Sequence, residues 1–293
     1  MLTDRETEEL GEAIDRIWEI GRGFGLDPFP THFEVVPATI MYEFGAYGLP
    51  GRFSHWTHGK AFHQMKMMYD YGLSKIYELV INANPAYAFL LETNSLLQNK
   101  FVVAHVFGHT DFFKNNIWFA PTNRQMLETV SQNALRIRQY GIEEGSLEVE
   151  RFLDAVLSLS DHIDPFPRRN GDAEEGESRT PSAAETPYDD LFPPAETTTL
   201  ATGRPLKGKP RGVRTKRKVP PEPEKDLLLF LLEHADHLED WQRDIIAIVR
   251  EESLYFVPQM QTKIMNEGWA SFWHNRIMRE LDLTDEEFVE YGR

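Results

Sequence analysis

Apolar positions with helical spacing recur over most of the chain and predict a mainly helical protein. In a first helix Leu10, Ile14 and Ile17 share one face, behind a Thr-x-x-Glu capping sequence and before a glycine-rich stretch at 21–25. The pattern predicts further helices at residues 59–82, 95–114, 122–141, 146–160, 224–250 and 256–281. Only residues 33–37 (FEVVP) have a good strand pattern. Residues 38–58 are aromatic and glycine-rich, and we interpret them as an irregular packed loop.

Composition divides the chain into three regions. Residues 1–166 and 225–293 are rich in apolar residues, whereas Pro, Gly, Ser, Thr and charged residues dominate 167–224. Such a composition cannot bury enough surface to order itself, so we expect a disordered linker there. Its basic block at 204–218 favours a solvated segment, with a polyanion contact as the alternative. We expect the third region to pack back on the first.

Charge and residue usage exclude several classes of protein. The net charge of −16 argues against a general nucleic-acid binder. The chain has no cysteine, so a metal would have to be held by His, Asp or Glu. No run of 18 apolar residues exists and the N-terminus is polar, which predicts a cytoplasmic protein without a membrane span.

A histidine pair is the strongest chemical signal. His105 and His109 are four residues apart on a predicted helix, so their imidazoles project from one face and can bind one metal ion. In the usual zinc-hydrolase motif a Glu follows the first His and acts as general base. Here that position is Val106, so a general base would have to come from elsewhere. The alternative is a pair of hydrogen-bonded core histidines. Asp111 could orient a ligand or lie at the surface near the helix end.

A second signal is the segment at residues 266–274 (NEGWASFWH). Glu267 and His274 are seven residues apart and therefore share a helix face among aromatic residues. A buried carboxylate needs a partner, which a metal ion would provide. A buried ion pair, for example with Arg276, is the alternative.

A third signal is a group of histidines beside Trp56. His55, His58 and His63 lie within nine residues. They could contribute ligands to a pocket, or they could be loop and helix-end residues bonded to the backbone.

Together these signals give the ligand set of a His2Glu zinc site, formed by His105, His109 and Glu267, with His274 facing the same pocket. Residues 267–270 (EGWA) resemble the third-ligand helix of some gluzincin metallopeptidases. We therefore predict a mainly α, zincin-like helical domain with little β structure, interrupted by the linker. One divalent metal, with zinc expected, is the predicted cofactor. Candidates for the general base are Glu92, Asp111, Glu251, Glu252 and, as a further catalytic candidate, His274.

Four longer strings resemble the SpoVR family, named for stage V sporulation protein R. They are residues 104–116 (AHVFGHTDFFKNN), 225–235 (KDLLLFLLEHA), 238–246 (LEDWQRDII) and 263–274 (KIMNEGWASFWH). The resemblance covers nearly the whole chain apart from the linker. It implies a cytoplasmic protein needed for spore cortex assembly in spore-forming bacteria. Family members usually continue beyond a segment like residues 281–288 (LDLTDEEF), so the resemblance is to their N-terminal portion.

The resulting hypothesis is a SpoVR-like sporulation protein whose metal site acts on amide or peptide bonds, with a peptide or cell-wall-related substrate. The alternative is a non-enzymatic scaffold that binds other sporulation proteins and whose His and Glu residues are structural. Metal content separates the two. A redox-active iron site is a third reading, but the paired Glu-x-x-His motifs of di-iron bundles are missing from the sequence.

Overall fold

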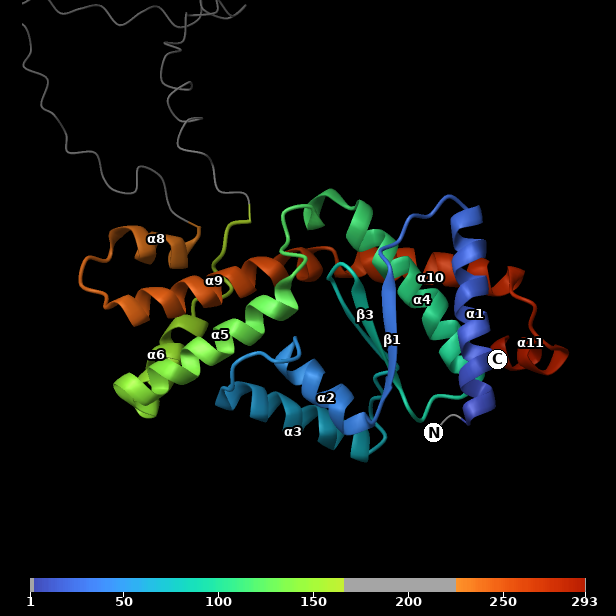
Figure 1. The fold of residues 1–293 in the computed structure, drawn as a ribbon, viewed down its shortest axis with the longest axis horizontal. Coiled ribbons are helices and arrows are strands. Elements are labelled where there is room, and N and C mark those ends of the chain that lie inside the picture. Colours follow the sequence, from blue (N-terminus) through green and yellow to red (C-terminus); the bar gives the residue numbers. More distant parts are fainter. Residues whose placement is uncertain (1–2, 166–224, 293) are drawn as a thin grey trace, which may run out of the picture. The chain divides into compact units, whose positions relative to one another are not determined.

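A computed structural model of the chain describes residues 3–165 and 225–292. Contacts divide the chain into two units, residues 1–163 with 227–293, and residues 164–226. Every helix and strand discussed below belongs to the first unit (Figure 1). The predicted linker lies almost entirely outside the described residues.

The described part is mainly helical, as the apolar spacing predicted. Its helices are α1 (Asp4–Gly23), α2 (Ala38–Tyr47), α3 (Trp56–Asp70), α4 (Leu96–Asn115), α5 (Met126–Tyr140), α6 (Ser146–Leu157), α8 (Leu227–His234), α9 (Asp240–Gln261), α10 (Lys263–Glu280) and α11 (Asp285–Tyr291). A short 3-10 turn (Ile117–Phe119) follows α4, and a π-turn (Gly141–Gly145) joins α5 to α6. None of the described helices is both long and apolar enough to cross a membrane.

One three-stranded sheet accompanies the helices. The strands β1 (Thr31–Val36), β2 (Glu78–Ile81) and β3 (Ala86–Leu91) lie in the order β1-β3-β2. β3 pairs in parallel with β1 and antiparallel with β2. The sequence predicted only β1. Three predictions are corrected: residues 38–47 form a helix rather than a loop, and the helix expected at 59–82 ends at Asp70, before β2. The helix expected at 224–250 is two helices, α8 and α9, and α9 continues through the expected break to Gln261.

The two faces of the sheet pack on different helices, because successive strand side chains point to opposite faces. On one face Val80, Ala88 and Leu90 join a core cluster with residues of α1, α4 and α10. On the other face Leu79, Phe89 and Leu91 join a cluster with residues of α2, α5 and α9. A third cluster joins α5, α6, α8 and α9 at the end of the unit away from α1 (Figure 1).

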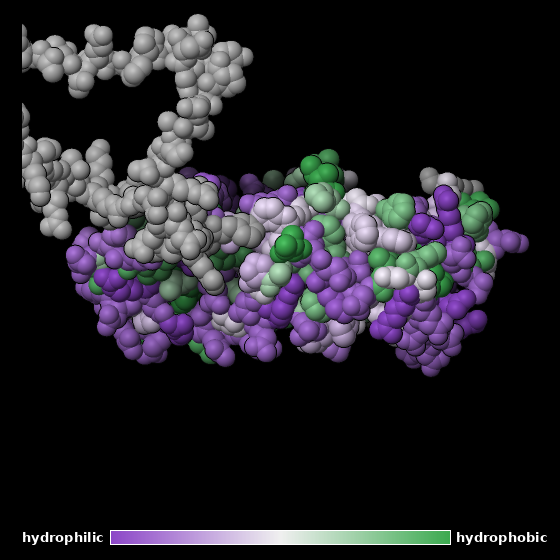
Figure 2. Space-filling view, turned by 90° about the horizontal axis from the view of Figure 1, so that it is seen from above, coloured by the Kyte–Doolittle hydropathy of each residue, from purple (hydrophilic) through white to green (hydrophobic). Residues whose placement is uncertain are grey.

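Helices α4 and α10 pack tightly against each other where they cross (Figure 1). Gly108 makes this approach possible: a Cβ there would lie 2.6 Å from the Ala270 Cα. The helix α4 is buried on nearly all sides, and Ser95 begins it with a capping box to Gln98. The visible face of the unit is mostly hydrophilic, with small separate hydrophobic patches (Figure 2).

Candidate metal centre

Four polar side chains from three elements meet beside the α4–α10 crossing. His105 and His109 come from α4, Glu78 from β2 and Glu267 from α10. One ligand atom each of Glu78, His105 and His109 lies within 4.8 Å of the other two, a separation at which the three could share a metal ion. This group is the candidate metal centre.

Glu267 approaches both imidazoles from α10. Its Oε2 lies 3.4 Å from His105 Nε2 and 3.8 Å from His109 Nε2. Nitrogen and oxygen ligands placed tetrahedrally at zinc-like bond lengths are about 3.3 Å apart, so these separations suit ligands of one ion. The Glu267 side chain is 53% exposed, whereas His105 and His109 are buried. The centre is therefore open to solvent on the α10 side.

The other nitrogen of each imidazole is held by α10. His109 Nδ1 lies 2.9 Å from Asn266 Oδ1, so Nδ1–H donates to the amide oxygen and leaves Nε2 free to bind a metal. His105 Nδ1 lies 2.9 Å from His274 Nδ1, so one of those two nitrogens carries the hydrogen. The residues present thus fit a divalent ion, with two imidazoles oriented by neighbours and two carboxylates in reach.

Electrostatics in the site favour uncharged histidines. Burial, with the neighbouring His109 and His274, lowers the pKa of His105 to about 3. Burial also lowers the pKa of His109, against the opposing effects of Asn266 and Glu267. Burial, with His109, lowers the pKa of His274 to about 4. A neutral imidazole is the form that binds metal.

The two carboxylates of the centre lack a cationic partner among the described side chains. Burial, and then the charge of Glu267, raises the pKa of Glu78 to about 7. Among the described residues, no Lys or Arg forms an ion pair with Glu78 or Glu267. The arrangement places two carboxylates beside two imidazoles with no positive charge to balance them, which a divalent cation would supply.

The other sequence-predicted residues lie in different surroundings. Asp111 is buried, and its carboxylate accepts hydrogen bonds from Asp27 N, Asn115 and Trp269 Nε1, so it ties α4 to α10. Glu252 pairs with Arg52, and Glu251 contacts Asn123. Glu92 follows β3, and its N–H donates to Val36 O. Glu92, Glu251 and Glu252 are not members of the candidate metal centre.

The structure also shows the surroundings of Val106, where the usual motif has a Glu, and of Glu78, which the sequence did not indicate. Val106 is fully buried in the core formed by α1, α4 and the sheet. The side chain at the position of the usual general base therefore points into the hydrophobic core. Glu78 lies within the helix predicted at residues 59–82, so the sequence did not indicate it as a site residue. The apolar run at 76–81 (IYELVI), preceded by Gly72, carried a strand signal that would have separated it.

The third histidine group lies elsewhere. His55 begins α3, where its Nδ1 accepts a hydrogen bond from Thr57 N, and its Nε2 lies 3.2 Å from Asp154 Oδ1. Trp56 Nε1 donates to the same carboxylate. The contact with Thr57 N is a helix-end backbone contact, as one interpretation of the sequence expected, whereas Asp154 is a side-chain partner from α6.

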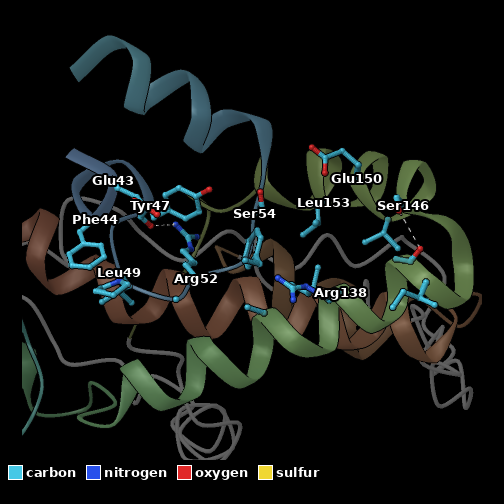
Figure 3. Close-up of a pocket in the computed structure, with 18 residues that line it drawn as sticks. Glu43, Phe44, Tyr47, Leu49, Arg52, Ser54, Arg138, Ser146, Glu150 and Leu153 are labelled. Carbon is cyan, nitrogen blue, oxygen red and sulfur yellow. Dashed lines mark hydrogen bonds between the residues drawn. The ribbon is translucent and has the colours of Figure 1, made fainter. Parts of the chain in front are cut away.

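A cavity of about 550 Å³ lies near this group, between the segment after α2, α5 and α6 (Figure 3). Arg52 and Tyr47 stand on one wall, and Arg138 of α5 and Glu150 of α6 on the other. Arg52 donates to Tyr47 O and to Glu252. The cavity is separate from the candidate metal centre, since the two share no residue.

Comparison with known proteins identifies the family. The SpoVR like protein family matches residues 4–293, and the chain belongs to this family. It is 35% identical over 277 residues to the uncharacterized protein YcgB of Escherichia coli (strain K12), covering 92% of this chain and 52% of YcgB. The chain therefore spans about half the length of this relative. No solved structure matches the chain significantly.

Proposed function

We propose that this protein is a metal-dependent hydrolase of amide or peptide bonds. His105, His109 and Glu267 would hold one divalent ion, with zinc expected. The observation that carries the proposal is the position of Glu267 Oε2, 3.4 Å and 3.8 Å from the two Nε2 atoms, on a helix distant in sequence. A bound ion would supply Lewis-acid polarisation of a carbonyl and a more acidic water.

Glu78 takes the role of general base in this proposal. Its carboxylate reaches the same two imidazoles from the sheet side, where it can accept the proton of an attacking water and pass it to the leaving amine. Glu78 would thus supply the general base that the usual motif takes from the position of Val106. His274 acts as a positioning residue, because it contacts His105 Nδ1 rather than the Nε2 side.

The substrate setting follows from the family. Because the family takes its name from a sporulation protein, we extend the proposal to amide bonds of cell-wall material, as in spore cortex assembly. The competing hypothesis is a scaffold for other sporulation proteins in which the same residues are structural.

Metal content decides between an ion-binding site and a structural cluster. We expect one zinc ion per chain by elemental analysis after zinc loading, and loss of stoichiometric binding in the His105→Ala, His109→Ala double variant. His63→Ala, at an exposed histidine of α3, is the matched control and should bind zinc as the parent does. A parent that stays metal-free with zinc, iron and manganese would end the proposal.

The roles of the two carboxylates are separated by zinc affinity. Glu267→Gln should weaken zinc binding, because amide oxygen is a poorer ligand than carboxylate, whereas Glu78→Gln should change the affinity much less. Calorimetric titration of both variants measures this. If Glu78→Gln causes the larger loss, Glu78 is the third ligand and the assignment is reversed.

A further inference from the structure

Strand β2 carries Glu78 into the candidate metal centre and is also an edge of the sheet. In the order β1-β3-β2 it pairs, among the described strands, only with β3. An edge strand offers unpaired N–H and C=O groups to an extended chain.

The hydrogen-bond pattern shows which backbone groups of β2 bond to β3. Leu91 N donates to Tyr77 O at 3.2 Å, so Tyr77 and Leu91 are a hydrogen-bonded pair. Because such pairs alternate in an antiparallel ladder, Leu79 and Ile81 also bond to β3.

The intervening residues therefore turn outward. The backbone groups of Glu78 and Val80 point away from β3, and among the described residues neither has a hydrogen bond beyond its own strand pair. The pattern on β3 agrees, since Ala86 N donates to Pro30 O and Glu92 N to Val36 O on the β1 side. Two N–H and two C=O groups beside the metal centre are thus unpaired among the described residues.

An apolar pocket of about 300 Å³ adjoins the same place. It is lined by Tyr77, Leu97, Gln98, Phe101, Val102, Glu290 and Tyr291. Tyr77 directly precedes Glu78 in the chain. The Phe101 ring stacks on His105, with ring centroids 6.3 Å apart, and lies 4.2 Å from the His274 ring. One wall of the pocket is therefore shared with the histidines of the centre.

We propose that an extended peptide pairs with the outward edge of β2 at Glu78 and Val80 and places one large apolar side chain in this pocket. The backbone pairing would fix the chain direction, and the pocket would choose the side chain. This inference names the substrate class of the proposed function and rests on it. A free carbohydrate chain has neither the alternating N–H and C=O groups nor the apolar side chain that the two features accept.

The test uses the zinc-loaded full chain and three hydroxamates measured by calorimetry. The probes are acetyl-Leu-Phe-hydroxamate, its Gly analogue and acetohydroxamate, which has only the metal-binding group. We expect the Phe compound to bind at least about tenfold more tightly than acetohydroxamate. N-methylation of its internal amide should remove about tenfold, as expected for one lost backbone hydrogen bond.

Two variants locate the contacts on the protein. Val80→Pro removes one outward N–H that the sheet does not use, and it should weaken the peptide compounds without changing acetohydroxamate. Tyr77→Ala should reduce the preference for Phe over Gly. If Val80→Pro fails to fold, the N-methylated probe tests the same hydrogen-bonded pairing from the ligand side.

Hydrogen exchange separates the possible failures. The Val80 amide should be protected only after peptide is added; protection beforehand would mean that another segment of this chain occupies the edge, and the inference would be wrong. It is also wrong if zinc binds but the peptide compounds bind no more tightly than acetohydroxamate. If zinc does not bind, the proposed function fails, and Val80 exchange with the amide acetyl-Leu-Phe-NH2 still tests the edge.

Discussion

Two polar clusters of the unit, one fully buried and one open to solvent on its α10 side, differ in how their charges are balanced. In the cluster around Arg52, the guanidinium donates to the fully buried Glu252 at 2.5 Å, and the ring of Phe256 covers it. In the candidate metal centre, Glu78 and Glu267 face two imidazoles and, within residues 3–165 and 225–292, no Lys or Arg pairs with them. The first cluster contains its own counter-charge, whereas the described part of the chain supplies none to the second.

This difference suggests how to separate structural from functional polar groups. A buried charge without a partner is expensive, so a folded protein normally supplies the partner itself. Where the chain leaves carboxylates uncompensated beside neutral histidines, an outside cation is the simplest partner. Substitutions test this difference, because removing a charge should have opposite effects on the free energy of unfolding in the two clusters.

The largest effect is expected at Arg52. Arg52→Met leaves Glu252 buried without its partner and should lower the free energy of unfolding by about 3–5 kcal/mol. Glu78→Gln, in the metal-free protein, removes a carboxylate that Glu267 repels and should leave stability equal or higher. Urea denaturation of both variants measures the contrast. Equal losses would mean that Glu78 has a counter-charge after all.

A medium effect is expected at the crossing of α4 and α10. Gly108→Ala forces a Cβ to 2.6 Å from Ala270 Cα, so the helices must separate, at a cost of about 1–3 kcal/mol. Zinc affinity should fall with it, since the two helices carry different members of the proposed ligand set. Gly11→Ala in α1, where a Cβ meets nothing within 4 Å, is the matched control. It should stabilise by about 0.5–1 kcal/mol, and a Gly108→Ala protein that behaves like it would contradict the close packing.

A smaller effect concerns pH and the Arg52 cluster. Burial, with Arg52 and His55, lowers the pKa of His58 to about 4. Below pH 6.5 the unfolded chain binds a proton that the folded protein refuses until about pH 4, so stability falls as the pH falls through this window, by at most about 1.4 kcal/mol per pH unit. We expect His58→Asn to flatten that slope in unfolding measurements between pH 7.5 and 5. An unchanged slope would assign it to other groups.

Much of this fold could be predicted from the sequence, but the sheet could not. Long amphipathic stretches such as Leu10–Trp18 have a clear period, and the helix at 95–114 was predicted within a residue. β3 is buried on both faces, so its sequence AYAFLL has no alternation to distinguish it from a core helix. β2 has four residues, too few for a period to stand out.

The residues of the candidate site likewise divide into those that a local sequence pattern suggests and those that only tertiary packing brings together. The four-residue spacing of His105 and His109 is a local property, so the sequence could suggest it. The approach of Glu267 depends on how α10 packs on α4, through Gly108 and Ala270, and no local pattern reports that contact. Glu78 required both a correct strand and its register. The sequence thus suggested the residues on single helices and missed the carboxylate that tertiary pairing brings in.

The ends of the segment between α6 and α8 meet, because Leu227 N donates a hydrogen bond to His162 O at 3.1 Å. With the ends fixed, loop-closure entropy grows only slowly with the length between them, by about 0.6 kcal/mol per doubling. Residues 1–163 and 227–293 can therefore be treated as two parts of one folded unit. Supplied as two separate polypeptides, the parts should reassemble in trans, and each would bring part of the proposed ligand set, His105 and His109 from one and Glu267 from the other. Zinc uptake would then report complementation between the fragments.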